Sequence, residues 1–139
     1  MRSILAGLVL AAVPLLSHAD EWFTVYGDPE HTAQDLIQIR PGSLAHLEGD
    51  LLSVEVRITR GSVRQAYGGG TYRGHSSTVA VDCEGRRAWY TRMKFYGEPG
   101  WMGPVTMERS FRQDEAPVMF KEIPDQADRL IRAACRLRR

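Results

Sequence analysis

The residues best suited to chemistry are the two cysteines of the sequence, Cys83 and Cys135. Redox and zinc sites usually hold cysteines at a CxxC spacing or place a histidine beside them. Neither cysteine has such a neighbour, and the two lie far apart in the chain. The pattern disfavours metal binding and thiol chemistry, and it favours a disulfide if the protein enters an oxidising compartment.

Three histidines, His31, His46 and His75, lie beyond residue 19. None has a second histidine or cysteine two to four residues further on, which is the spacing that metal sites use. We therefore interpret them as isolated side chains. No metal and no cofactor is predicted.

The motifs of nucleophilic and phosphate chemistry are also missing from the sequence. No serine occupies a GxSxG motif, and Gly68-Gly69-Gly70 is not followed by the Lys-Ser/Thr pair of a phosphate-binding loop. Asp82 beside Cys83 is explained by strand alternation, which turns neighbouring side chains to opposite faces. The sequence predicts a protein that is not an enzyme.

The first 19 residues have the organisation of a cleavable signal peptide. Arg2 precedes an apolar run from Ile4 to Leu16, and the small-residue pattern Ser17-His18-Ala19 follows. The run is shorter than the roughly 20 apolar residues of a membrane-spanning helix, and Pro14 interrupts it. We expect cleavage between Ala19 and Asp20, and no transmembrane anchor afterwards. No cysteine lies near that site to accept a lipid, so the periplasm or secretion is expected before display on the outer surface.

The mature chain, residues 20–139, suits a single domain with a neutral charge balance. Cleavage removes Arg2 from the 18 basic side chains and leaves all 17 acidic ones, so the formal net charge becomes zero. No overall field favours nucleic acid. In an exported protein an even number of cysteines usually pairs, so Cys83 and Cys135 are predicted to form a disulfide. Closing a loop of about 50 residues stabilises a fold by about 4 kcal/mol on the chain-entropy model.

Period-two alternation predicts antiparallel strands through most of the domain, most clearly from Leu52 to Thr59. We expect Glu84-Gly85 to form a two-residue hairpin turn, and Trp89 to share a face with Met93 and Phe95, opposite Tyr90. The expected strands are residues 22–26, 36–39, 52–59, 71–83, 86–96 and 104–111.

The period changes to that of a helix after Pro124, with Asp125 expected as the cap. The apolar positions at helical spacing are Ala127, Leu130, Ile131, Ala134 and Leu137. A bond from Cys83 to Cys135 would pin this helix across the sheet. Arginines in its last turn suit an anion or a membrane surface, but they also complement the helix dipole, which is the simpler interpretation.

Aromatic and basic residues mix in two places, beside the glycine loop and on the expected outer face of the hairpin. Such surfaces stack on sugars, bases or protein partners, although tyrosine is also common in ordinary strands. The candidate ligand-binding residues are Tyr67, Tyr72 and Arg73 at the first place, and Tyr90, Arg92 and Lys94 at the second.

Several short motifs resemble the surface-adhesin protein E-like family of exported Gram-negative proteins. They are Ile39-Arg40-Pro41-Gly42-Ser43-Leu44 followed by Gly49, Tyr72 to Ser76, Val81-Asp82-Cys83, Tyr96, and Ile123-Pro124 with a short helix that ends in Cys135.

The resemblance implies an α+β fold: an antiparallel sheet of about six strands with one C-terminal helix packed on it and tied by a disulfide. It also implies a protein partner, since founding members bind host extracellular-matrix proteins and dimerise through the sheet. The expected function is a non-enzymatic binding module. The alternative is an envelope enzyme or an enzyme inhibitor of the lysozyme-inhibitor type, because those proteins are also exported β domains with a disulfide.

Overall fold

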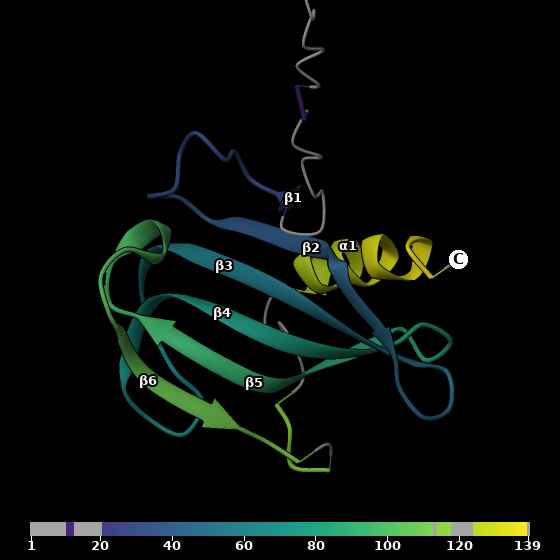
Figure 1. Ribbon diagram of the computed structural model, residues 1–139. Helices are drawn as coiled ribbons and strands as arrows, with labels where there is room; N and C mark the ends of the chain where they lie inside the picture. Colours follow the sequence, from purple (N-terminus) through teal and green to yellow (C-terminus); the bar gives the residue numbers. More distant parts are fainter. Residues whose placement is uncertain (1–10, 13–20, 113, 118–123, 139) are drawn as a thin grey trace, which may run out of the picture.

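The computed structural model describes residues 11–12, 21–112, 114–117 and 124–138 (Figure 1). The predicted signal peptide and its cleavage site between residues 19 and 20 lie outside these residues, apart from Ala11 and Ala12. Among the described residues, no helix is long and apolar enough to cross a membrane. The elements are β1 (Phe23–Tyr26), β2 (Leu36–His46), β3 (Leu51–Gln65), β4 (Thr71–Asp82), β5 (Arg87–Tyr96), the 3-10 turn η2 (Pro99–Trp101), β6 (Val105–Ser110) and α1 (Pro124–Arg136).

The strands form one six-stranded sheet in which each strand is antiparallel to the next along the chain. Helix α1 lies against one face and contacts β1, β2, β4 and β5. The predicted α+β fold, with an antiparallel sheet and one helix near the C-terminus, is confirmed.

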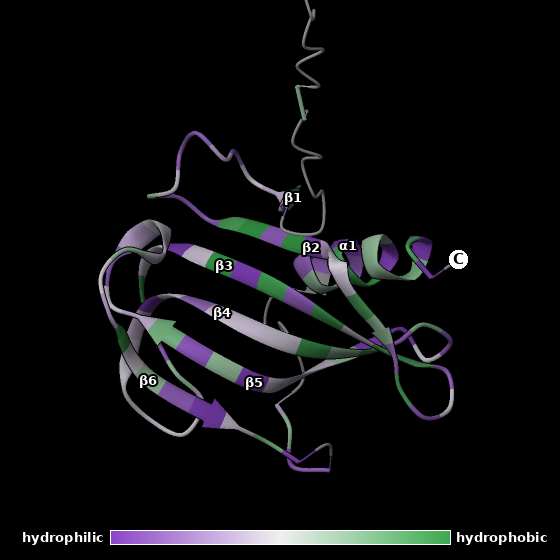
Figure 2. Cartoon of the chain, in the orientation of Figure 1, coloured by the Kyte–Doolittle hydropathy of each residue, from purple (hydrophilic) through white to green (hydrophobic). Residues whose placement is uncertain are grey.

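The core lies between α1 and the inner face of the sheet. Along β3, the apolar residues from Leu52 to Ile58 are buried at every second position, and the polar residues between them are partly exposed. Figure 2 shows this alternation of hydrophobic and hydrophilic residues along β3 and β5. From the helix, Leu130 and Ala134 are fully buried against the strands. The alternation of apolar and polar residues therefore determines which face of the sheet is buried.

Helix α1 starts at Pro124, so Asp125 lies in the first turn instead of at the predicted cap. An acidic side chain there still complements the positive end of the helix dipole. The helix ends at Arg136, which leaves Leu137 outside it and partly exposed.

Two contacts fix α1 to the sheet, one near each end. Cys83, after β4, forms the predicted disulfide with Cys135, and their Cα atoms are 5.9 Å apart. Near the other end, Nη1 of Arg60 donates a hydrogen bond to Oε1 of Gln126 over 2.8 Å. Arg60 is 4% exposed, and Asp35 lies 3.4 Å from the same nitrogen. Burial opposes ionisation of Asp35, but the Gly61 amide and Arg60 outweigh it and lower the pKa of its carboxyl.

Strand β2 is longer than predicted, because Pro41-Gly42-Ser43 does not end it. The pairing of β2 with β3 is irregular between Arg40 and Ala45. Within this irregularity the Ser43 hydroxyl donates to the Arg40 carbonyl over 2.6 Å and accepts the Glu55 amide over 2.7 Å. A side chain thus replaces a missing backbone partner, and the strand continues through the proline.

The hairpin of β4 and β5 differs from the prediction in its turn and in its faces. The turn spans Cys83 to Arg86 instead of two residues, and Arg86 has a φ of 51°. Thr91 has no partner in the register between Thr78 and Val79, which makes it a bulge. A bulge shifts the alternation by one residue. Tyr90 is therefore 7% exposed and packs in the core, and Trp89 points to the opposite face, the reverse of the prediction.

The disulfide yields the first prediction. Its loop spans 52 residues, so replacing both cysteines with serine (Cys83→Ser, Cys135→Ser) is expected to lower the free energy of unfolding by about 4 kcal/mol. Urea denaturation followed by circular dichroism measures the change. Reduced wild-type protein should match the double variant, and the exposed Ser110→Ala change should leave stability within about 0.5 kcal/mol. A loss below about 1 kcal/mol would contradict the tethering role.

Candidate functional site

The face of the sheet opposite α1 carries the polar side chains of the alternating strands. Among the described residues, η2 and Trp22 reach over this face, and no helix covers it. All three tryptophans of the sequence lie on it. We call it the tryptophan–arginine face and define it by Trp22, Trp89, Trp101, Arg40, Arg57, Arg92 and Lys94.

Trp101 is fixed by hydrogen bonds at the end of η2. Its indole N–H is 3.0 Å from the Ile58 carbonyl and 3.2 Å from the His75 carbonyl, and it donates to both. The Gly100 amide donates to the Thr59 hydroxyl over 3.0 Å. The backbone of Trp101 has a φ of 58°, a conformation that costs a bulky residue about 1 kcal/mol or more. These hydrogen bonds hold the ring in place despite that cost.

Arg57 on β3 lies between two tryptophan rings. Its guanidinium carbon is 4.5 Å from the centre of the Trp22 ring and 4.2 Å from that of Trp101. Its Nε donates to Oε1 of Gln38 over 2.7 Å. Burial between the rings lowers the pKa of the Arg57 guanidinium. Beside this stack, Arg40 is 5.7 Å from the Trp22 ring and forms an ion pair with Glu55. The two rings and the hydrogen bond to Gln38 thus hold the Arg57 cation in a fixed position between aromatic side chains.

The other half of the face lies on β4, β5 and β6. Arg92 binds Glu108 of the neighbouring strand through Nε and Nη2, at 3.0 and 2.5 Å. These hydrogen bonds lower the pKa of the Glu108 carboxyl. Lys94 is in register with Glu108. A polar hollow of about 130 Å³ opens between these strands, lined by Glu55, Ser76, Ser77, Thr78, Arg92 and Lys94.

The structure separates the six predicted binding residues. Arg92 and Lys94 lie together on the uncovered face, as expected. Tyr72 and Tyr90 instead flank His75 on the buried side, with ring centres 5.7 and 5.2 Å from the imidazole. Tyr67 is exposed at the glycine loop and packs edge-on against Phe111. Arg73 is half-buried and donates to the Arg60 carbonyl over 3.2 Å.

The sequence analysis missed the stack of Arg57 with Trp22 and Trp101. Alternation along β3 already placed Arg57 on the polar face. No local pattern placed the two tryptophans there, because they arrive from segments far from β3 in the chain. The signal that could have found the stack is the tryptophan count. The sequence has three tryptophans, and the strands need only one apolar face to build the core.

A buried histidine–serine pair is the arrangement nearest to catalytic chemistry. Nδ1 of His75 lies 2.6 Å from the Ser77 hydroxyl. His75 is 1% exposed and Ser77 is also buried. Burial, and secondarily the charge of Arg60, lowers the pKa of His75 to about 3. Because both side chains are buried, a substrate has no access to them, and the pair satisfies polar groups inside the core.

Within the described part of the chain, no three His, Cys, Asp or Glu side chains come together as a metal site would require. No protein-family model, no curated protein and no solved structure matches this chain.

The buried histidine yields a pH prediction. The pKa of His75 is about 3 when folded and 6.5 in its ordinary state, so the unfolded chain binds the proton more tightly. Its neutral form therefore stabilises the fold fully above pH 6.5, and this contribution falls as the pH drops towards 3. We expect wild-type protein to lose about 2 kcal/mol of unfolding free energy between pH 7 and pH 5.

Urea denaturation at the two pH values measures this loss. The His75→Gln variant should lose much less between them, whereas His46→Gln, a change at an exposed position, should keep the wild-type slope. Equal slopes in all three proteins would contradict the assignment to His75.

Proposed function

We propose that this chain is an exported, non-enzymatic binding module that holds a protein partner on its tryptophan–arginine face. The observation that carries the proposal is the Arg57 guanidinium stacked between Trp22 and Trp101 on the uncovered face of the sheet. Tryptophan and arginine are enriched among the residues that contribute most to protein–protein binding.

Preorganisation favours binding at this face. Hydrogen bonds from Trp101 and Arg57 fix both groups before a partner arrives, so little side-chain freedom would be lost on association. Arg92 and Lys94 extend the face with charge that orients a partner carrying acidic groups. The type of partner follows from the family resemblance, which favours host extracellular-matrix proteins.

Export is the second part of the proposal. The disulfide between Cys83 and Cys135 suggests an oxidising compartment, and the signal-peptide pattern of residues 1–19 favours the periplasm or secretion. Self-association through the sheet belongs to the same proposal, because β1 and β6 are edge strands whose outer sides have no neighbouring strand in the sheet. Sedimentation equilibrium across a range of concentrations tests for the dimer.

The binding proposal is tested with immobilised laminin and vitronectin as probes. We expect saturable binding to at least one of them, weakened tenfold or more by the Trp89→Ala, Arg92→Ala double change, because removing interface anchors costs about 1 to 2 kcal/mol each. Arg112→Ala is the matched control, since Arg112 is an exposed arginine outside the face. Absence of saturable binding, or equal affinity of the double variant, would contradict the proposal.

Hydrolase and lysozyme-inhibition assays distinguish the alternative, an envelope enzyme or enzyme inhibitor, from the proposed binding module. We expect the protein to hydrolyse none of a panel of ester, peptide and glycoside substrates, and to leave lysozyme activity unchanged at equimolar concentration. Inhibition of lysozyme would replace the adhesin-like function with that of an envelope enzyme inhibitor.

A further inference from the structure

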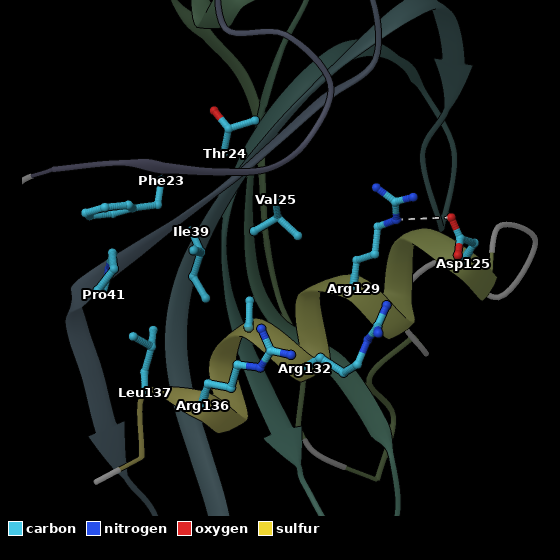
Figure 3. Close-up of a pocket in the computed structure, with 11 residues that line it drawn as sticks. Phe23, Thr24, Val25, Ile39, Pro41, Asp125, Arg129, Arg132, Arg136 and Leu137 are labelled. Carbon is cyan, nitrogen blue, oxygen red and sulfur yellow. Dashed lines mark ion pairs between the residues drawn. The ribbon is translucent and has the colours of Figure 1, made fainter.

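A groove of about 680 Å³ lies between β1 and α1, on the side of the sheet away from the tryptophan–arginine face (Figure 3). Strand β1 and the neighbouring part of β2 form one wall, and the exposed side of α1 forms the other. The volume falls in the range of about 300 to 1,000 Å³ that is usual for small-molecule sites.

The strand side of the groove is apolar. Phe23 and Val25 of β1 line it, and Ile39 of β2 lies at its buried base. Leu137 closes the end beyond the helix. Phe23 is 52% exposed and Leu137 36%. Exposed apolar side chains that converge on one hollow indicate a binding site more strongly than the same side chains scattered over a surface.

The helix side of the groove is cationic. Arg129, Arg132 and Arg136 stand at positions i, i+3 and i+7 and line it together, which spreads their charges over about 10 Å of helix. Arg129 pairs with Asp125 and Arg132 with Asp128, over 3.3 and 3.1 Å.

Arg136 forms no ion pair within the residues that the structure describes, and it lies beside Leu137 (Figure 3). Two of the three guanidinium charges are thus balanced locally. The surplus positive charge of the groove is at the end where the apolar Leu137 is also found.

We infer that this groove binds a single-chain anionic amphiphile, a fatty acid, with its carboxylate at Arg136 and the neighbouring Arg132 and its chain along Phe23, Val25 and Ile39. A free inorganic anion would leave the apolar wall unused. A protein partner would have to extend beyond the groove, because a standard interface buries about 800 Å² on each side. A fatty acid suits both walls. Its hydrocarbon chain packs against the apolar wall, and its carboxylate forms strong charge-assisted hydrogen bonds with the guanidinium groups of the helix.

The inference is independent of the proposed function, because the groove and the tryptophan–arginine face share none of their defining residues. Failure of either proposal leaves the other standing, and the two experiments use different probes and different variants.

Isothermal titration calorimetry with laurate, below its micelle concentration, tests the inference on protein expressed from the full sequence. We expect one saturable site per chain. The Arg132→Gln, Arg136→Gln double change should weaken it tenfold or more, and Phe23→Ser should weaken it severalfold. Arg112→Gln, an exposed arginine on a distant loop, should bind as wild type does. Butyrate, which lacks the chain, and dodecyltrimethylammonium, which reverses the charge, should not bind measurably.

Circular dichroism melting checks that each variant is folded. If the double variant does not fold, the single Arg136→Gln variant replaces it in the titration. Absence of laurate binding overturns the inference, as does equal binding of dodecyltrimethylammonium or an unchanged affinity in the arginine variants. An extended acidic peptide that binds at these arginines while laurate does not would also overturn it, since the occupant would then be an added strand beside β1.

Discussion

The structure depends on how one short helix is held against one face of the sheet. A 13-residue helix is marginal in water by itself, because its stability must come from packing its apolar side. The Cys83–Cys135 disulfide fixes its last turn to the end of β4. The buried Arg60 fixes its first turn through Gln126. With both ends attached, Leu130 and Ala134 stay over the strands and the inner face remains dry.

This attachment gives the two faces of the sheet different chemistry. Under the helix, polar groups must find partners or remain uncharged, so His75 is neutral beside Ser77 and Arg60 lies next to Asp35 and Gln126. On the other face the same strands keep charged and aromatic side chains at the surface. The helix also leaves part of β1 beside it uncovered, which creates the groove of Phe23 and the three arginines.

Much of the fold could be predicted, because it is recorded in local patterns. The alternation along β3 needed no knowledge of its neighbours, and neither did the helical spacing of Leu130 and Ala134. Bulges are different, because they arise from the match between two strands. The bulge at Thr91 reversed the faces of Trp89 and Tyr90, and the Ser43 hydroxyl carried β2 past Pro41. Of the six predicted binding residues, Arg92 and Lys94 lie together on the open face.

The sequence by itself determined the class of structure: six alternating segments, one helical segment, and two cysteines that pair. Hydrophobic periodicity is a property of a few neighbouring residues, and an even number of cysteines limits which pairs can form. Both can therefore be recognised in the sequence before the fold is known. Only the tertiary structure decided which side chains meet. The stack of Arg57 between Trp22 and Trp101, and the row of arginines opposite Phe23, each join segments far apart in the chain. Contacts of this kind depend on strand register and helix placement, which local patterns do not specify.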